Sequence, residues 1–282
     1  MPKISVLMPV YKTNEKFLRE AIESILKQTF DDFEFLILDD CPEDSREKVV
    51  KSYKDKRIKY YKNEKNLGIT PTRNKLIDLA KGEYLAIMDH DDIRLPESFS
   101  EEVKVLDNHP NIGVVGSAIH KIVKNKDVFL PEYDEDIKVA LMAKCAVTHP
   151  SSMVRRSLLV DNHIYYEEHY SPAEDYRLWS RLIDYTDFYN IPKVLFCYRD
   201  WRNNTTHIQD DKMNKAGAEI SAENMVKYPV LERRFSLSAK HIDFVRLFGF
   251  IPFLKIVTQG NRRKTYLFNS ILLYTAKKST KL

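Results

Sequence analysis

Residues 84–92 read YLAIMDHDD, so a short apolar run leads directly into three carboxylates within four positions. An uninterrupted apolar run of this length is typical of a strand that is buried on both faces of a parallel sheet. Neighbouring carboxylates repel one another, which is costly unless a cation neutralises them. The segment predicts a buried strand whose end carries a charged site at Asp89, Asp91 and Asp92.

The preceding sequence repeats this pattern of an apolar run followed by a helical segment. Apolar runs lie at 4–8, 33–38 and 58–61. Strands that alternate with helices form right-handed βαβ units around a parallel sheet. We therefore predict an α/β fold, with a Rossmann-like and mostly parallel sheet flanked by helices.

A second acidic pair, Asp39-Asp40, follows the apolar run at 33–38. Ligands of parallel sheets bind beyond the carboxyl ends of the strands, so this pair and Asp89 are expected to face one crevice. A carboxylate there can accept the imide N–H of uracil or bind ribose hydroxyls. The alternative is a simple turn, because the sequence DCPEDS that begins at Asp40 is rich in turn formers.

The later part of the chain is less regular. We expect a strand at 114–122, helices at 134–144 and 171–184, and a last strand at 194–198. Beyond about residue 212 the alternation stops, and we predict a mainly helical tail. The catalytic domain is accordingly expected to span 1–211, with an extension at 212–282.

The helix expected at 171–184 begins with Ser-Pro-Ala-Glu-Asp. Ser171 followed three positions later by Glu174, with Pro172 between them, predicts a capping box. Asp175 has no such structural task and is expected to be a rigidly held carboxylate that can act as a general base. The alternative for Asp175 is a charge that only complements the helix dipole.

Three other side chains admit two interpretations each. Tyr11, which follows Pro9 at the end of the first strand, either stacks on a base or lies at the rim with its hydroxyl in water. Arg73 either pairs with a phosphate or is a solvated helix residue. His149 either contacts an acceptor or is satisfied within a turn.

Composition excludes several classes of protein. Hydrophobic residues make up 43% and charged residues 30% of the 282, which is typical of a folded globular chain. The net charge of +4 is too small to indicate a nucleic-acid partner. Three scattered cysteines form no CxxC pair, so we expect neither a zinc site nor a disulfide framework, but a reducing, cytoplasmic setting. We find no secretory signal pattern and no apolar run of about 18 residues.

These segments together resemble the inverting family 2 glycosyltransferases of the GT-A fold. The resemblance covers about residues 3–206. It rests on ISVLMPVY at 4–11, SILKQTFDDFEFLILDD at 24–40, NLGITPTRNKLIDLAKGEYLAIMDHDD at 66–92 and AEDYRLWSRL at 173–182. The order and spacing of these pieces make the match specific.

The resemblance implies a donor site in a nucleotide-sugar half, at about 1–110. Tyr11 and Asp40 would hold the uracil of a UDP-sugar, with Pro9 and Asp39 nearby. Arg73 would lie close to the nucleotide. An acceptor half is expected at about 111–211, for a saccharide or a lipid-linked saccharide of bacterial surface polysaccharide biosynthesis such as lipopolysaccharide.

The resemblance also implies the catalytic groups. Asp89 and Asp91 would form the DxD element beside the nucleotide, and Asp91 or Asp92 would contact Mn²⁺ or Mg²⁺. Asp175 would be the catalytic base of a single displacement that inverts the anomeric configuration. The acceptor side would include three further residues, His149, Glu174 and Trp201.

The sequence departs from the family at one place. The family often shows Tyr-Arg-x-His-x-x-Asn after the last strand, and here Trp201 stands in the position of that His. Trp cannot ligate a cation, so we expect Trp201 to pack near the acceptor or a closing loop. Either Arg199 or Arg202 then neutralises the diphosphate, or that role is absent.

Two other functions compete with this interpretation. A sugar nucleotidyltransferase would also use such a sheet and a metal, but it usually has a Gly-rich loop after the first strand, and 9–14 contains no glycine. A non-catalytic scaffold that binds nucleotide sugars is opposed by the intact Asp91 and Asp175. Release of UDP from a UDP-sugar would distinguish the main interpretation from both.

The tail has an uneven charge. From Leu247 to Leu282 there are seven lysines and arginines and no acid, interleaved with apolar blocks at 247–254 and 267–274. This combination is typical of a segment that lies on an anionic membrane surface, which predicts a peripheral association with the inner face of the cytoplasmic membrane. The alternative is a helix pair packed on the catalytic domain.

Overall fold

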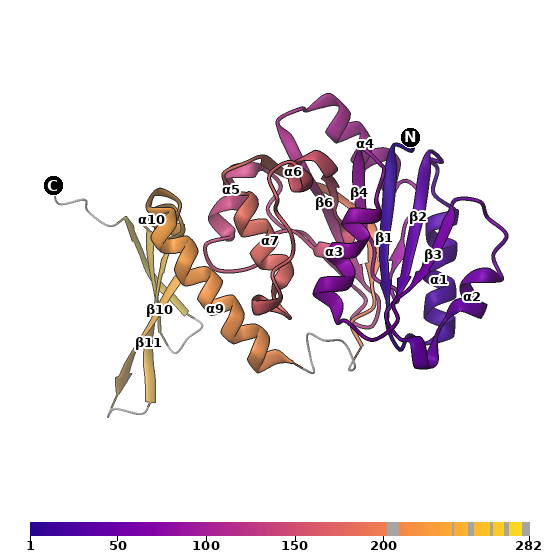
Figure 1. The fold of residues 1–282 in the computed structure, drawn as a ribbon. Helices are drawn as coiled ribbons and strands as arrows, with labels where there is room; N and C mark the ends of the chain where they lie inside the picture. Colours follow the sequence, from indigo (N-terminus) through magenta and orange to yellow (C-terminus); the bar gives the residue numbers. More distant parts are fainter. Residues whose placement is uncertain (202–208, 239, 248–250, 260–261, 268–270, 278–282) are drawn as a thin grey trace. The chain divides into compact units, whose positions relative to one another are not determined.

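The computed structural model describes residues 1–201, 209–238, 240–247, 251–259, 262–267 and 271–277. The residues form two compact units, Met1–Ala222 and Glu223–Leu282 (Figure 1). This division falls later than the boundary expected at residue 211, because the first part of helix α9 (Asp210–Lys227) packs on the first unit. Ile220 is fully buried there, and the Ser221 hydroxyl donates to the Met142 carbonyl at 2.6 Å.

The amino-terminal part of the first unit alternates strands and helices as predicted. Its elements are β1 (Ile4–Val10), α1 (Glu15–Leu26), β2 (Phe33–Asp39), η1 (Pro42–Asp44), α2 (Glu47–Lys51), β3 (Ile58–Lys62), α3 (Ile69–Leu79) and β4 (Tyr84–Ile87). Strand β1 continues through Pro9, where we expected it to stop. Pro9 lies past the end of the β1–β4 ladder at Leu7, so its missing N–H interrupts no pairing there.

The remaining elements of the first unit are more varied. They are β5 (Ile93–Arg94), α4 (Ser98–Asn108), β6 (Ile112–Lys121), β7 (Lys126–Val128), α5 (Asp134–Ala140), η2 (His149–Ser151), β8 (Met153–Arg155), α6 (Arg156–Val160), η3 (Glu168–Tyr170), α7 (Glu174–Leu182) and β9 (Asp187–Tyr198). Each strand and helix expected in this part is present, although α5 and α7 are shorter than predicted and β9 is longer.

One sheet joins both parts of the unit. Its strand order is β3-β2-β1-β4-β8-β6-β9-β5, with β7 paired to β6. The longest ladders, β1 with β2 and β6 with β9, are parallel, while the antiparallel ladders of β8 are only two or three residue pairs long. The predicted α/β fold with a mostly parallel sheet is confirmed, and the expected donor and acceptor halves share this sheet.

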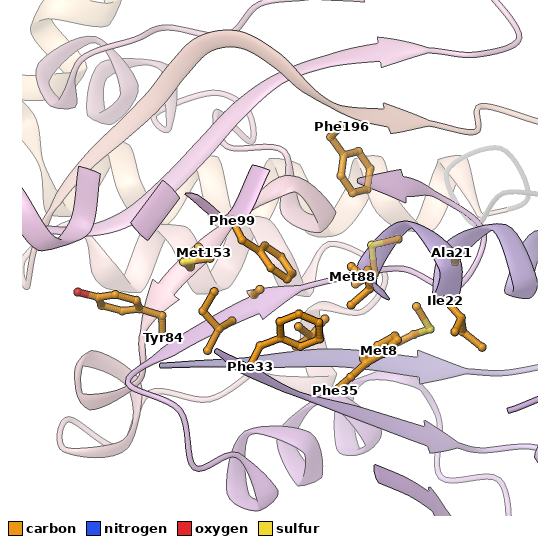
Figure 2. Close-up of a cluster of buried hydrophobic side chains, with 14 of the residues drawn as sticks. Met8, Ala21, Ile22, Phe33, Phe35, Tyr84, Met88, Phe99, Met153 and Phe196 are labelled. Carbon is orange, nitrogen blue, oxygen red and sulfur yellow. The ribbon is translucent and has the colours of Figure 1, made fainter. Parts of the chain in front are cut away.

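The hydrophobic core lies between the sheet and its helices (Figure 2). Every residue of β1 and β2 is buried, as expected for strands covered on both faces. Helix α1 begins after Asn14, whose side chain accepts the N–H of Lys16, and it buries its apolar face with Leu18 and Ile22 fully covered. Each such side chain stabilises the fold by roughly 1.5–3 kcal/mol.

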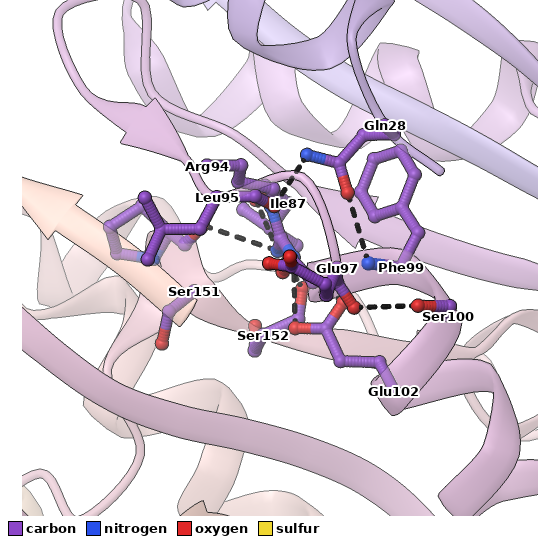
Figure 3. Close-up of polar contacts among 12 residues, drawn as sticks. Gln28, Ile87, Arg94, Leu95, Glu97, Phe99, Ser100, Glu102, Ser151 and Ser152 are labelled. Atoms are coloured by element: carbon purple, nitrogen blue, oxygen red, sulfur yellow. Dashed lines mark hydrogen bonds and ion pairs between the residues drawn. The ribbon is translucent and has the colours of Figure 1, made fainter. Parts of the chain in front are cut away.

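A buried ion pair ties the strand ends to helix α4 (Figure 3). The Arg94 guanidinium binds both carboxylate oxygens of Glu102 at 2.8 and 2.7 Å, and both side chains are inaccessible to solvent. Its second nitrogen donates to the carbonyls of Ile87 and Ser152, at 3.1 and 2.9 Å. The acidic loop that follows β4 is therefore fixed at both ends, because Arg94 follows it and binds the carbonyl of Ile87, which precedes it.

The second unit contains α10 (Pro229–Ser238) and four strands, β10 (Lys240–Leu247), β11 (Ile251–Gln259), β12 (Arg262–Leu267) and β13 (Ile271–Lys277). The strands form an antiparallel sheet in the order β10-β11-β12-β13. The helical tail is confirmed for α9 and α10 but wrong for the four described strands β10 to β13. These segments are rich in β-branched and aromatic residues, and this composition favours strands. None of the helices among the described residues is long and apolar enough to cross a membrane.

Candidate active site

The carboxyl ends of neighbouring parallel strands bring the two predicted acidic segments to one edge of the sheet. Strand β1 pairs with β2 on one side and with β4 on the other. Asp40 follows β2 directly, and its N–H donates to the Val10 carbonyl at the end of β1. Asp89 and Asp91 follow β4, beyond the bond from the Met88 N–H to the Leu7 carbonyl. This strand order therefore places both acidic segments at the same edge of the sheet, as we expected.

Asp39 is committed to holding its own loop. It is fully buried, and its carboxylate accepts from the N–H groups of Cys41 and Arg46 and from the hydroxyls of Ser45 and Tyr60, at 2.7–3.0 Å. Four donors fill the acceptor capacity of a carboxylate. The structure gives Asp39 a structural task, and its expected place near the nucleotide stays a prediction.

Asp40 organises the next loop but retains capacity. Its Oδ1 accepts from the Asn63 amide at 2.8 Å and from the Leu67 N–H at 2.9 Å, while its Oδ2 accepts only the Gly68 N–H at 2.9 Å. Gly68 has a φ of +88°, a conformation that suits glycine, and it leads into α3. One acceptor position on Oδ2 is left for a ligand.

Pro9 and Tyr11 lie on either side of the end of β1. Pro9 is buried and lines a small pocket together with Leu7, Arg73 and Tyr166. Tyr11 is 39% exposed, with the Lys12 ammonium 5.1 Å from its ring centre. An exposed ring at this edge is available for stacking on a base, so the structure is compatible with the first of its two interpretations.

Arg73 links the acidic loop to helix α7. Its guanidinium donates to Glu174 at 2.6 Å and to Asp89 at 3.2 Å, and it lies 5.6 Å from the ring centre of Tyr166. Burial lowers the pKa of Arg73, but the charges of Asp89 and Glu174 outweigh this effect and raise it overall. Arg73 is therefore a fixed cation within the site and not a solvated helix residue.

The predicted capping box at Ser171 and Glu174 is wrong. Helix α7 begins at Glu174 after Ala173, and no side chain caps it. The Glu174 carboxylate binds Arg73, which lies 101 positions away in the sequence. The Ser171 N–H donates to the Glu168 carbonyl instead, and a bond between two charged groups outweighs one from a carboxylate to a neutral N–H.

Asp175 is a partly buried carboxylate with a hydrogen-bond partner at each oxygen. Its Oδ1 accepts the N–H of Tyr176, the next residue, at 2.6 Å, and its Oδ2 lies 3.9 Å from the thiol of Cys145. Burial, together with the negative charge of Glu174, raises the pKa of Asp175 to about 6. A carboxylate with this pKa is ionised at neutral pH and is a better proton acceptor than an ordinary aspartate.

The acidic loop concentrates negative charge around two partly exposed carboxylates. The side chains of Asp89 and Asp91 are 28% and 18% exposed. Asp92 is 1% exposed, and its Oδ1 accepts the Arg199 N–H at 2.7 Å. Burial, and then the charges of Asp91 and Asp89, raise the pKa of Asp92 well above the usual range. Asp92 therefore supports the loop through Oδ1, while its buried Oδ2 has no hydrogen-bond partner among the described residues, and a contact of Asp92 with the cation stays a prediction.

The carboxylates of Asp89 and Asp91 fit a hard divalent cation. Oxygen atoms of the bound substrate would complete the coordination of that cation. No group of three or more ligand side chains gathers at one point in the part of the chain that the structure describes. Mg²⁺ is usually held by one or two carboxylates together with phosphate oxygens and water, not by a full protein cage. Asp89 and Asp91 provide such a pair, and each has one oxygen outside the hydrogen bonds to Arg73 and Trp201.

His149 is satisfied within the turn η2, the second of its two interpretations, and Trp201 contacts the acidic loop. His149 is only 4% exposed, its Nε2 lies 2.8 Å from the Tyr166 hydroxyl, and burial together with Arg73 holds its pKa well below the usual range. It supports Tyr166 and offers no acceptor surface. The Trp201 N–H donates to Asp91 at 3.1 Å, on the donor side. Arg202, the other expected diphosphate partner, lies outside the described residues.

Two residues of the site were missed in the sequence. Tyr166, which carries no motif in the sequence, contacts both His149 and Arg73. Arg94 follows the acidic loop and binds the carbonyl of Ile87, which precedes it, and its only sequence signal was the spacing of four between Arg94, Ser98 and Glu102. Such spacing is too common on helix surfaces to indicate a buried network by itself.

Known proteins resemble this chain in sequence and in fold. Residues 5–161 match the family described as "Glycosyl transferase family 2". An uncharacterized glycosyltransferase of Methanocaldococcus jannaschii is 38% identical over 208 residues, which are 70% of this chain and 71% of that protein.

Two solved structures share the fold. Staphylococcus aureus TarS 1–349 in complex with UDP-GlcNAc has a TM-score of 0.66 and 23% identity, over 83% of this chain and 70% of that one. The mannosyltransferase PcManGT of Pyrobaculum calidifontis, in complex with GDP-Man and Mn²⁺, has a TM-score of 0.57 and 15% identity, over 82% and 73%. The fold is thus that of GT-A glycosyltransferases, and the chain belongs to glycosyl transferase family 2.

Proposed function

We propose that the protein transfers a sugar from a UDP-sugar to a hydroxyl of a saccharide or lipid-linked saccharide, with inversion at the anomeric carbon. The observation that carries this proposal is the Arg73 bridge. Arg73 binds Asp89 of the acidic loop and Glu174, whose neighbour Asp175 is the candidate base. Asp89, which would hold the cation beside the diphosphate, and Asp175, which would accept the hydroxyl proton, are therefore joined in one network through Arg73 and Glu174.

Asp175 is proposed as the general base. Its carboxylate accepts the proton of the acceptor hydroxyl while the hydroxyl oxygen bonds to the anomeric carbon. The bond from that carbon to the diphosphate oxygen breaks at the same time, and UDP leaves from the opposite face. The pKa of about 6 supports this role, since Asp175 is ionised before the reaction and can accept the proton during it.

The donor is proposed to lie along the edge formed by β1, β2 and β4. The open acceptor position on Asp40 suits the imide N–H of uracil, and the exposed ring of Tyr11 suits stacking on the base. TarS, which shares the fold, was solved with UDP-GlcNAc. Asp89 and Asp91 would hold Mn²⁺ or Mg²⁺, which when bound neutralises the charge that develops on the leaving diphosphate.

The decisive experiment is turnover of nucleotide sugars by the full chain. A panel of UDP- and GDP-sugars is incubated with Mn²⁺ and a saccharide acceptor, and the release of nucleoside diphosphate is measured. We expect UDP release that stops in EDTA. Release of GDP in preference to UDP would refute the uracil assignment, and undiminished release in EDTA would refute the cation. A total lack of release would favour the scaffold.

The carboxyl-terminal sheet is proposed to hold the enzyme at an anionic membrane surface, where lipid-linked acceptors of surface polysaccharides such as lipopolysaccharide occur. The strand register supports this, because Lys240, Gln259, Arg262 and Lys277 occupy one row across the four strands. Three of these four positions are basic, and each basic residue near an anionic surface contributes about 1 kcal/mol. This association would be peripheral, on the cytoplasmic face.

Vesicle binding tests the membrane proposal. The full chain should sediment with phosphatidylglycerol vesicles at low salt and less at high salt. Changing both Arg262 and Lys277 to Gln should reduce sedimentation, whereas Lys27→Gln, at an exposed position of the first unit, should not. Equal loss in both variants, or no sedimentation of the unmodified chain, would refute a specific role of the sheet.

A further inference from the structure

Three residues after the end of β9 lies a tryptophan, Trp201, whose polar atom faces the acidic loop. The Nε1–H of Trp201 donates to Oδ2 of Asp91 at 3.1 Å. The indole ring meets the ring of Phe17, on α1, edge to face, with 5.6 Å between the ring centres and an angle of 83°. Trp201 is therefore held by packing on one side, while its single donor group is directed at one carboxylate oxygen.

The same short segment fixes the backbone of the loop. The Arg199 N–H donates to Oδ1 of Asp92, and the Arg199 Nε–H donates to the carbonyl of Asp91, both at 2.7 Å. The Arg199 guanidinium also lies 4.0 Å from the ring centre of Phe17. Three donors from residues 199–201 thus converge on Asp91 and Asp92, and Asp91 is held through both its backbone and its side chain.

We propose that Trp201 is a positioning residue for the divalent cation. By occupying Oδ2 of Asp91, the indole N–H fixes the rotation of the carboxylate and leaves Oδ1 as the ligand oxygen. Indole nitrogen is a donor only, so Trp201 acts through Asp91 and does not bind the cation. This inference rests on the proposed cation site at Asp89 and Asp91.

The alternative is that Trp201 only fills space against Phe17. The two ideas differ for Trp201→Phe, because phenylalanine keeps an aromatic ring but lacks the N–H. Loss of a hydrogen bond that orients a metal ligand typically weakens metal binding 10- to 100-fold. Loss of packing alone would leave the affinity for the cation unchanged.

The test compares the full chain with two variants. Free Mn²⁺ is measured by electron paramagnetic resonance in the presence of UDP for the unmodified protein, Trp201→Phe and Tyr53→Phe. The control Tyr53→Phe removes a hydrogen bond of the same length, 3.1 Å, from Tyr53 to the Glu23 carboxylate, on the outer surface. We expect about tenfold weaker Mn²⁺ binding in Trp201→Phe only, with UDP affinity in EDTA and circular dichroism unchanged.

Each other outcome is decisive. Equal Mn²⁺ affinity in all three proteins would show that Trp201 only packs, while the cation site itself would stand. If the unmodified protein bound no Mn²⁺ in the presence of UDP, the cation site would fall, and this inference with it.

Fluorescence gives a second measurement. The chain contains two tryptophans, at 179 and 201, and paramagnetic Mn²⁺ quenches emission from a nearby indole. We expect Mn²⁺ with UDP, but not Mg²⁺ with UDP, to quench the unmodified protein. The quenching should disappear in Trp201→Phe under saturating Mn²⁺. Quenching of the same size in that variant would place the cation nearer Trp179 and overturn the proposal.

Discussion

Replacing Asp175 by Asn should have two opposite effects: it should slow the transfer reaction and stabilise the folded protein. Asparagine keeps the size of the side chain and can still accept the Tyr176 N–H, but it cannot take up a proton. Loss of a general base lowers the rate of transfer by about 10²- to 10⁴-fold. The affinity for UDP should not change, because Asp175 is proposed to contact neither the base nor the cation.

The same substitution should stabilise the folded protein at neutral pH. The pKa of Asp175 is about 6 in the folded state, against an ordinary value of 3.8. A raised pKa means that the folded state binds the proton more tightly, so this group contributes stability below about pH 4 and loses it as the pH rises through 6. The two-unit difference, discounted for partial exposure, corresponds to about 1–2 kcal/mol at pH 7.

Thermal unfolding at two pH values checks this linkage. Asp175→Asn should unfold about 2–8 °C above the unmodified protein at pH 7, and the difference should vanish near pH 4. Asp161→Asn, at an exposed position outside the site, should shift neither the stability nor the rate. A stabilised variant with full transfer activity would refute Asp175 as the base. An inactive variant without the pH-dependent gain would show that its carboxylate is not destabilised by burial.

Three further predictions concern the same site. In the unmodified protein, kcat/KM should fall about tenfold per pH unit below pH 6, because protonated Asp175 cannot accept a proton; a profile flat to pH 5 would contradict this. Glu174→Ala should cost about 3 kcal/mol of stability in urea unfolding, since it leaves buried Arg73 with one partner, and Glu174→Gln should cost less; equal, negligible effects would show that the ion pair is not formed. Asp39→Asn should lower stability by about 1–3 kcal/mol with little change in UDP affinity per folded molecule, whereas Asp40→Asn should also weaken UDP binding, as measured by calorimetry; the reverse result would exchange their roles.

The parts of the fold that sequence predicted well are those marked by continuous apolar runs between helical segments. The apolar runs at 4–8, 33–38 and 84–88 are strands because burial on both faces demands continuous hydrophobicity. Their parallel order then brings the following acids to one edge, so the location of the site could be inferred without knowing any contact.

The partners of those acids could not be read from sequence. Glu174 had a plausible local role in a capping box, but its partner is Arg73, from a different helix. Asp39 and Asp40 look equivalent in sequence, and only the number of donors around each distinguishes them. When the fold brings opposite charges together in a buried place, the ion pair is more stable than the local hydrogen bond that the sequence pattern predicts.

The tail shows a different limit. Short apolar runs fit a buried strand and a helix equally well, and periodicity alone does not separate them. The apolar block at 251–254 was interpreted as helical and lies in β11. The better signal was the pairs of turn formers between the runs, Gly260-Asn261 and Asn269-Ser270, which are typical of connections between antiparallel strands.

The continuous sheet of the first unit restricts how this enzyme can move during a catalytic cycle. Strand β8 pairs with β4 on one side and with β6 on the other, so no flexible linker separates the parts expected to bind donor and acceptor. Hinge motions need a few residues that absorb large backbone rotations. Residues within a hydrogen-bonded strand ladder cannot rotate in this way without breaking their hydrogen bonds. We therefore expect product release to depend on rearrangements of loops and side chains at the rim and not on a hinge between the two parts.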